Sequence, residues 1–194
     1  GDGNHSLATA KACWEELKQT LDNEARESHP ARYALVEVVN LHDPALNFEP
    51  IHRVLFDTAP EPFLRRLEAA LNRAGCPARR GARGTGCPIG LVSAEGADTL
   101  WLELAPRQLP VALLQPALDE ALAPGERLDF IHGEEAVRAL CAKPGRLGLI
   151  LPPFDKGALF PTVQAQGPLP RKSFSMGEAH EKRYYFECRR IRSI

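Results

Sequence analysis

The chain has 194 residues, of which 44% are hydrophobic and 25% charged, and its formal net charge is −1. This composition is typical of a folded globular protein of one large or two small domains. No run approaches the ~18 apolar residues that cross a bilayer, and no signal-peptide pattern is present, so we expect a cytoplasmic protein with no membrane partner. The near-neutral charge argues against nucleic acid as a partner, and five cysteines without CxxC spacing indicate neither disulfides nor a zinc cluster.

The first predicted element is a helix over residues 6–23. Apolar residues there recur three and four positions apart, which places them on one helical face. We expect four of them to be buried: Leu7, Trp14, Leu17 and Leu21.

The six residues that lead into this helix have the composition of an anion-binding turn: Gly1, Asp2, Gly3, Asn4, His5 and Ser6. Glycines let a ligand approach the backbone, and the N–H groups of a helix N-terminus attract negative charge. Asp2 and His5 could transfer protons or hold a metal ion. Asp, Asn and Ser are also common N-cap residues, so a purely structural role is an equal alternative.

Further elements alternate between strands and helices along the chain. We predict strands at residues 32–41, 51–56, 89–94, 99–104, 128–132, 146–151 and 183–191, and helices at 60–74, 111–122, 134–142 and 154–166. The glycine-rich stretch 76–86 is expected to be a loop, residues 89–104 a hairpin, and strand 146–151 central in its sheet. The pattern favours one α+β unit, a mixed β-sheet with flanking helices.

Four short motifs in this order resemble the bacterial family catalogued as domain of unknown function 1015 (DUF1015). They are the opening turn, residues 40–44 with 50–53, residues 129–133 and residues 169–173. The resemblance covers the whole chain and implies that it corresponds to the C-terminal portion of a member. A strand is expected before the turn, so we expect an N-terminal part to be missing. Members often carry an arginine where this chain has Ser6.

The opening turn is also similar to the signature box of the ParB and sulfiredoxin superfamily, some members of which bind nucleotides or phosphorylate free serine. This resemblance implies a nucleotide-dependent phosphotransferase, using ATP or ADP with Mg²⁺, in which Asp2 and His5 are catalytic. The phosphate-binding candidates are Gly1, Gly3, Asn4, Ser6, His52, Arg53, His132 and Lys172. We expect His5, His52, His132, Asp2 and Arg53 to share one cleft.

Two alternatives remain open from the residues alone. The same pocket could serve a non-catalytic ligand-binding or regulatory domain, and each histidine taken singly could be a hydrogen-bonded structural residue. Lys172 and Ser173 could equally mark the start of a strand. In the resembling kinases the catalytic acid lies upstream of the turn, which implies that residues 1–194 alone do not catalyse the reaction.

Overall fold

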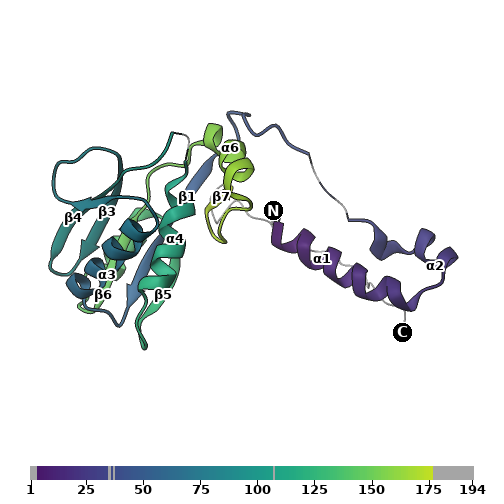
Figure 1. The fold of residues 1–194 in the computed structure, drawn as a ribbon, viewed down its shortest axis with the longest axis horizontal. Coiled ribbons are helices and arrows are strands. Elements are labelled where there is room, and N and C mark those ends of the chain that lie inside the picture. The colour runs from purple at the N-terminus through teal and green to yellow at the C-terminus, as the bar shows by residue number, and fades with distance from the viewer. Residues whose placement is uncertain (1–3, 35, 37, 107, 177–194) are drawn as a thin grey trace. The chain divides into compact units, whose positions relative to one another are not determined.

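The structure is a computed structural model that describes residues 4–34, 36, 38–106 and 108–176 (Figure 1). The chain divides into two compact units at Asp43, and the second unit begins at Pro44. Gly1, Asp2 and Gly3 lie outside the described residues, as does the predicted strand 183–191.

The first unit begins with a series of helices. Helix α1 covers Asn4–Leu17 and continues as the 3-10 helix η1, Lys18–Thr20; α2 covers Asn23–Ser28 and the 3-10 helix η2 Pro30–Arg32. The Asp22 carboxylate caps α2 by accepting a hydrogen bond from the Ala25 N–H at 2.8 Å. The helix predicted from residue 6 is thus present, but it begins at Asn4 and its regular α-helical part ends at Leu17.

The prediction that this helix buries its apolar face is wrong. Leu7 is 41% exposed, and Trp14, Leu17 and Leu21 are only half-buried. The Trp14 ring packs against the ring of His29, with centroids 5.9 Å apart. The helices α2 and η2 are too short to cover a stripe of this length. The spacing of the apolar residues predicted the helix correctly, but burial of its apolar face also requires a neighbouring surface to cover it.

The predicted buried strand 32–41 is also wrong for the residues that the structure describes. Residues 33, 34, 36 and 38–40 have neither strand nor helix structure, and Tyr33, Val36, Val38 and Val39 are exposed. Their β-branched and aromatic side chains favour strands, but a strand also needs a hydrogen-bonding neighbour. The described structure supplies no such neighbour for this segment.

The second unit is built on a seven-stranded sheet with the order β2-β4-β3-β6-β1-β5, in which β7 pairs with β1. The strands are β1 Phe48–Phe56, β2 Ala78–Arg80, β3 Cys87–Ser93, β4 Gly96–Leu102, β5 Arg127–His132, β6 Arg146–Ile150 and β7 Phe174–Met176. Every described pairing is antiparallel. The α+β class is confirmed, and its sheet is antiparallel where the sequence suggested a mixed one.

Several strand predictions are confirmed in this sheet. β6 lies between β3 and β1, as its continuous apolar character predicted, and β3 and β4 form the expected hairpin with Ser93 opposite Gly96. One short strand was not predicted, because β2 lies within the expected loop 76–86. The strand β7 begins directly after Ser173, where a strand start was one of the two alternatives.

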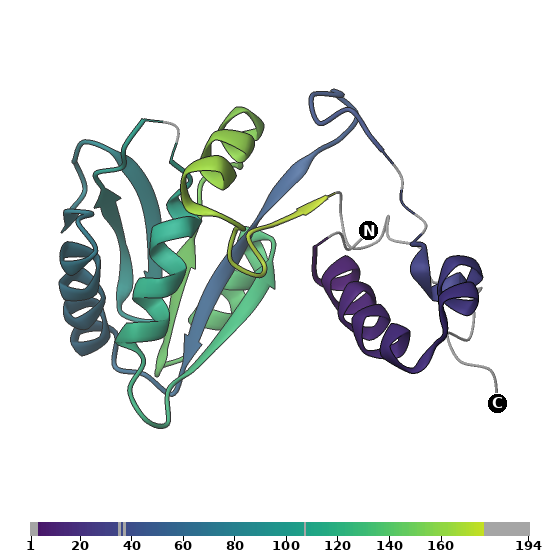
Figure 2. The same cartoon turned by 45° about the vertical axis from the view of Figure 1, so that its right-hand side comes forward.

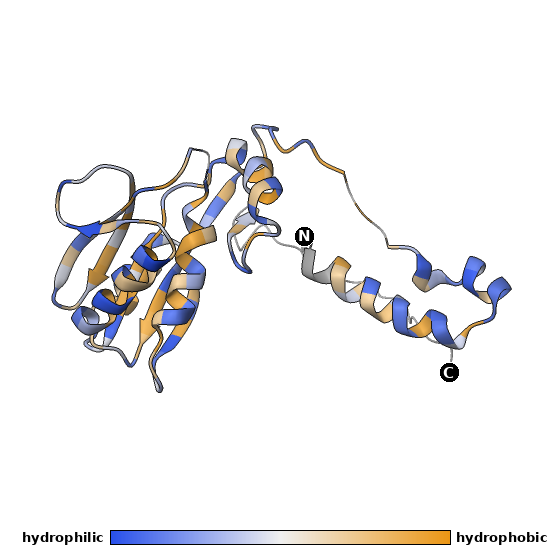
Figure 3. Ribbon diagram, viewed as in Figure 1, coloured by the Kyte–Doolittle hydropathy of each residue, from blue (hydrophilic) through white to orange (hydrophobic). Residues whose placement is uncertain are grey.

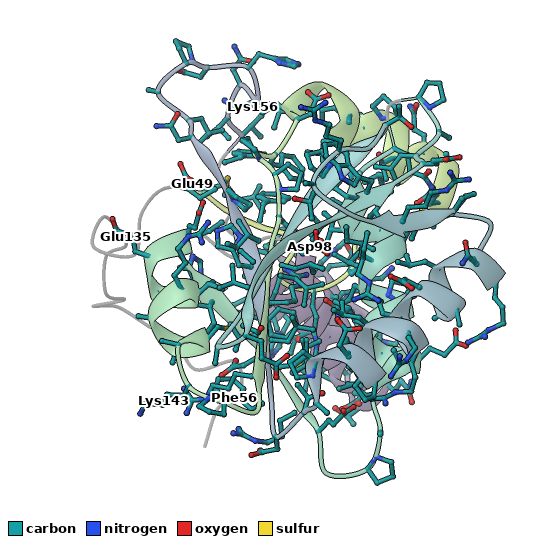
Figure 4. All side chains as sticks on the ribbon, turned by 90° about the vertical axis from the view of Figure 1, so that its left-hand side faces the viewer. Glu49, Phe56, Asp98, Glu135, Lys143 and Lys156 are labelled. Carbon is teal, nitrogen blue, oxygen red and sulfur yellow. The ribbon has the colours of Figure 1, made fainter. Side chains whose placement is uncertain are left out.

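The helices of this unit confirm their predicted ranges closely. They are α3 Pro60–Arg73, α4 Pro110–Ala121, α5 Glu134–Cys141 and α6 Lys156–Gln166. Figure 2 shows α3 and α4 over one face of the sheet, while Figure 4 shows the helix that carries Glu135, α5, on the other. Figure 3 shows hydrophobic residues concentrated on the strands between these layers.

The two faces of the sheet have separate apolar cores. Leu55, Leu149 and Leu91 belong to a large cluster shared with α3 and α4, whereas Val54 and Val92 pack with Val137 and Cys141 of α5. Because successive strand residues point to opposite faces, β1 contributes alternately to both cores.

Candidate cationic site on strand β1

Arg53 is a buried charge on the face of β1 that α4 covers. Its side chain is 0% exposed, its Nε donates to Gln115 Oε1 at 3.0 Å, and its Nη1 donates to the Ile51 carbonyl. The Gln115 amide in turn donates to Asp119 Oδ1 at 2.9 Å. Burial lowers the pKa of Arg53 to about 10, and the Asp119 charge opposes this shift. The guanidinium therefore remains charged at neutral pH and is linked through Gln115 to a carboxylate.

The remaining nitrogen of this guanidinium, Nη2, is buried and has no hydrogen-bond partner among the described residues. A buried donor left unpaired costs about 1–3 kcal/mol, so most such groups in native proteins find a partner. Arg53 therefore has one donor group available for an oxygen atom that this part of the chain does not provide.

Phe130 contacts two guanidinium groups, those of Arg53 and Arg171. It is paired directly with Arg53 across β1 and β5, and the Arg53 Cζ lies 4.9 Å from the centroid of its ring. Arg171 lies over the same ring, with its Cζ 5.7 Å from the centroid. Aromatic rings attract cations over their faces. Phe130 is half-buried and Arg171 is exposed, so this cationic stack extends from the interior to the surface.

Three of the sequence motifs meet at this stack. Arg53 ends the motif at residues 50–53, Phe130 belongs to residues 129–133, and Arg171 belongs to residues 169–173. The last motif is held here because β7, which follows it, pairs with the start of β1, with Pro50 opposite Phe174. Figure 2 shows β7 beside that end of β1.

Lys172 adds another exposed cation directly after Arg171. Its φ of +59° lies in the left-handed region, which is uncommon for a residue other than glycine. The turn is closed by the Ser173 hydroxyl, which donates to the Pro170 carbonyl. Arg171 and Lys172 therefore project from a tight turn that leads into β7.

His52 does not belong to this stack, although it precedes Arg53. The Leu151 N–H donates to His52 Nδ1 at 3.1 Å, and the imidazole is buried. Burial lowers the pKa of His52, while the Glu134 charge partly opposes this shift. A neutral histidine that accepts a backbone hydrogen bond ties β1 to the end of β6. This geometry supports the alternative that His52 is a hydrogen-bonded structural residue.

The other predicted site residues are placed as follows. His132 is exposed at the end of β5, opposite Ile51. Asn4, His5 and Ser6 form the first turn of α1, where the sequence indicated a turn before a helix. Gly1, Asp2 and Gly3 lie outside the described residues. The convergence of Asp2 and His5 with Arg53 stays a prediction.

The pocket described in the second unit lies away from the predicted site residues. A pocket of about 170 Å³ lies between the start of α3 and the β3–β4 turn, and its residues Glu61 and Arg80 are paired at 2.7 Å. It contains none of the predicted site residues and is smaller than the ~300–1,000 Å³ of typical small-molecule sites. Within the described part of the chain, no cluster of three or more His, Cys, Asp or Glu side chains could hold a metal ion.

Sequence reasoning missed four members of the network around Arg53. Phe130 and Arg171 lie inside quoted motifs, but neither was named as a site candidate. Gln115 and Asp119 were missed altogether. They are four positions apart on α4, so they lie on one helical face beside buried Leu114 and Leu118. A polar pair on an otherwise apolar helix face was the signal available in the sequence.

Fold and site together define an α+β protein with a cationic stack on β1 and the edge strand β5. The sequence matches the family described as "Protein of unknown function (DUF1015)" over residues 1–185, and the chain belongs to this family. No curated protein matches the sequence.

The fold is similar to that of a solved structure, a conserved hypothetical protein from Pyrococcus furiosus. The TM-score is 0.53 at 12% sequence identity, and the match covers 74% of this chain and 61% of that protein. At this identity the likeness concerns the fold alone. The matched region thus spans about three fifths of the Pyrococcus protein's length. Among the described residues, no helix combines the length and apolarity that crossing a membrane requires.

Proposed function

We propose that this chain forms the phosphate-binding part of a nucleotide-dependent phosphotransferase of the ParB-like, free-serine-kinase type. The observation that carries the proposal is the meeting of three motifs at one cationic stack, where Arg53, Phe130 and Arg171 come from β1, β5 and the turn before β7. Phosphoryl transfer depends mainly on positioning and on cations that neutralise phosphate oxygens.

Arg171 and Lys172 are the residues best suited to bind the phosphates. Both are exposed, and they are adjacent in a turn whose backbone is fixed by the Ser173 hydroxyl and by β7. Arginine can hold two oxygens of one phosphate, and lysine adds a point charge. The opening turn contributes the proposed chemistry, with Asp2 and His5 as proton-transfer or metal-binding groups and ATP or ADP with Mg²⁺ as cofactor.

A non-catalytic ligand-binding role is the second candidate, and one observation favours it. The polar groups that we describe around Phe130 are two guanidinium groups, an amide and the Asp119 carboxylate, which already accepts a hydrogen bond from Gln115. This set is suited to binding anions.

Two measurements separate these candidates. A thermal-shift series with ATP, ADP and pyrophosphate, each with and without Mg²⁺, tests binding, because a ligand that binds only the folded state raises the melting temperature. Formation of phosphoserine from L-serine and either nucleotide, measured on the protein at its natural length, tests catalysis. Binding with turnover supports the phosphotransferase, and binding without turnover supports the regulatory domain. No stabilisation by any of these ligands contradicts both candidates.

A further inference from the structure

The unpaired donor of Arg53 differs from the other cations of the stack in burial and in local charge. Nη2 lies in the interior, whereas Arg171 and Lys172 are exposed. The Arg53 charge is also partly compensated, because Asp119 lies one hydrogen bond beyond Gln115. The stack therefore offers two environments for an anion, one buried with a partly compensated charge, the other exposed and positive.

These environments suit different ligands. Moving a charge out of water is costly, and the cost rises steeply with the number of charges that are moved. A multiply charged phosphate chain is therefore better bound at the exposed cations, where water and Mg²⁺ share its charge. A single carboxylate brings one negative charge, which the one unpaired Nη2 group can bind.

The other nitrogens of Arg53 already have partners. Nε donates to Gln115 and Nη1 to the Ile51 carbonyl, so Nη2 is the nitrogen that remains for a ligand oxygen.

We infer that Arg53 binds the carboxylate of a second substrate, while Arg171 and Lys172 bind phosphate. This inference rests on the proposed function, whose acceptor, free serine, carries a carboxylate. Arg53 would then be a binding residue that fixes the acceptor beside the phosphate-binding turn.

The test is an NMR titration of the ¹⁵N-labelled chain, observing the Arg53 Nε–H and the backbone amides of Arg171 and Lys172. The probes are acetate, its uncharged analogue acetamide, and pyrophosphate. We expect acetate to shift the Arg53 Nε–H in a saturable way, acetamide to shift it less, and pyrophosphate to shift mainly the two turn amides. An Arg53 response to pyrophosphate as large as that to acetate, or no saturable response to acetate, overturns the inference.

The turn amides report on the proposed function separately. If they do not respond to pyrophosphate, the phosphate-binding proposal fails, whatever Arg53 shows. If they respond and Arg53 is silent to acetate, only the carboxylate assignment fails. The two failures are therefore distinguishable in one experiment.

A charge variant tests the same inference without altering Arg53. Asp119→Asn removes the compensating charge, so acetate should bind roughly two- to fivefold more tightly, as expected for one exposed charge. Glu120→Gln is the matched control, because Glu120 is the next residue of α4 and pairs with Arg73 instead. An equal effect of both variants, or no effect of Asp119→Asn, contradicts a carboxylate site at Arg53.

Discussion

His52 and Arg53 are neighbours in β1, and their side chains lie on opposite faces of the sheet. His52 accepts a hydrogen bond from the Leu151 backbone, while Arg53 bonds to Gln115 of α4. This alternation follows from the geometry of any strand. His52 and Arg53 belong to the same sequence motif, but only Arg53 therefore belongs to the cationic stack.

The buried imidazole of His52 should make the stability of the second unit depend on pH. Burial lowers the pKa of His52 below its ordinary value of 6.5, so the unfolded chain binds this proton more tightly. The stabilisation is complete above about pH 6.5 and is lost as the pH falls toward the lower folded value. His52→Asn keeps an acceptor near Nδ1 but cannot titrate. Urea unfolding from pH 8 to pH 5 should show a smaller loss of stability in His52→Asn than in the wild type; an equal loss would refute this role.

Gly148 of β6 allows α5 to pack closely against the sheet. A Cβ at this position would lie 2.5 Å from Val137 Cγ1 and 3.0 Å from Cys141 Sγ. Gly148→Ala should therefore destabilise the second unit by about 1–3 kcal/mol through overpacking. In the double variant with Val137→Ala, the space left by valine should relieve part of this loss. Additive effects of the two substitutions, measured by urea unfolding, would rule out the contact as the cause.

Helices α1 and α3 should differ in how much stability they lose when a leucine side chain is shortened to alanine. Leu67 of α3 is fully buried, so Leu67→Ala should cost about 2–5 kcal/mol. Leu17 of α1 is only half-buried, and Leu17→Ala should cost well under about 2 kcal/mol. Chemical denaturation of both variants tests the contrast, which fails if the Leu17 substitution costs as much as the Leu67 substitution.

Local pattern was sufficient for most of the second unit. The stripe Phe63, Leu64, Leu67 predicted α3, and continuous apolar residues predicted the central position of β6. In both cases the residues that define the element also form its buried contacts. The same reasoning predicted strand structure for Val36, Val38 and Val39, where pairing, and not propensity, decides the outcome.

The candidate site was predictable only in part, for a related reason. The motifs that contain Arg53, Phe130 and Arg171 could be read from the sequence, but their meeting depends on the register of β1 with β5 and β7. Gln115 lies 62 positions from Arg53, and no local pattern links them. His52 was a phosphate-binding candidate because of its side-chain chemistry, whereas in the structure it accepts a backbone hydrogen bond.

Calorimetric titration of pyrophosphate into the wild type, Arg171→Gln and Arg127→Gln tests the central claim most directly. Arg127 is the matched control, because its Cζ lies 5.1 Å from the Phe56 ring at the other end of β1. Loss of charge-assisted hydrogen bonds should weaken binding to Arg171→Gln by roughly tenfold or more, while Arg127→Gln should bind like the wild type. Equal affinities for all three proteins, or no binding by the wild type, would contradict a phosphate site at Arg171.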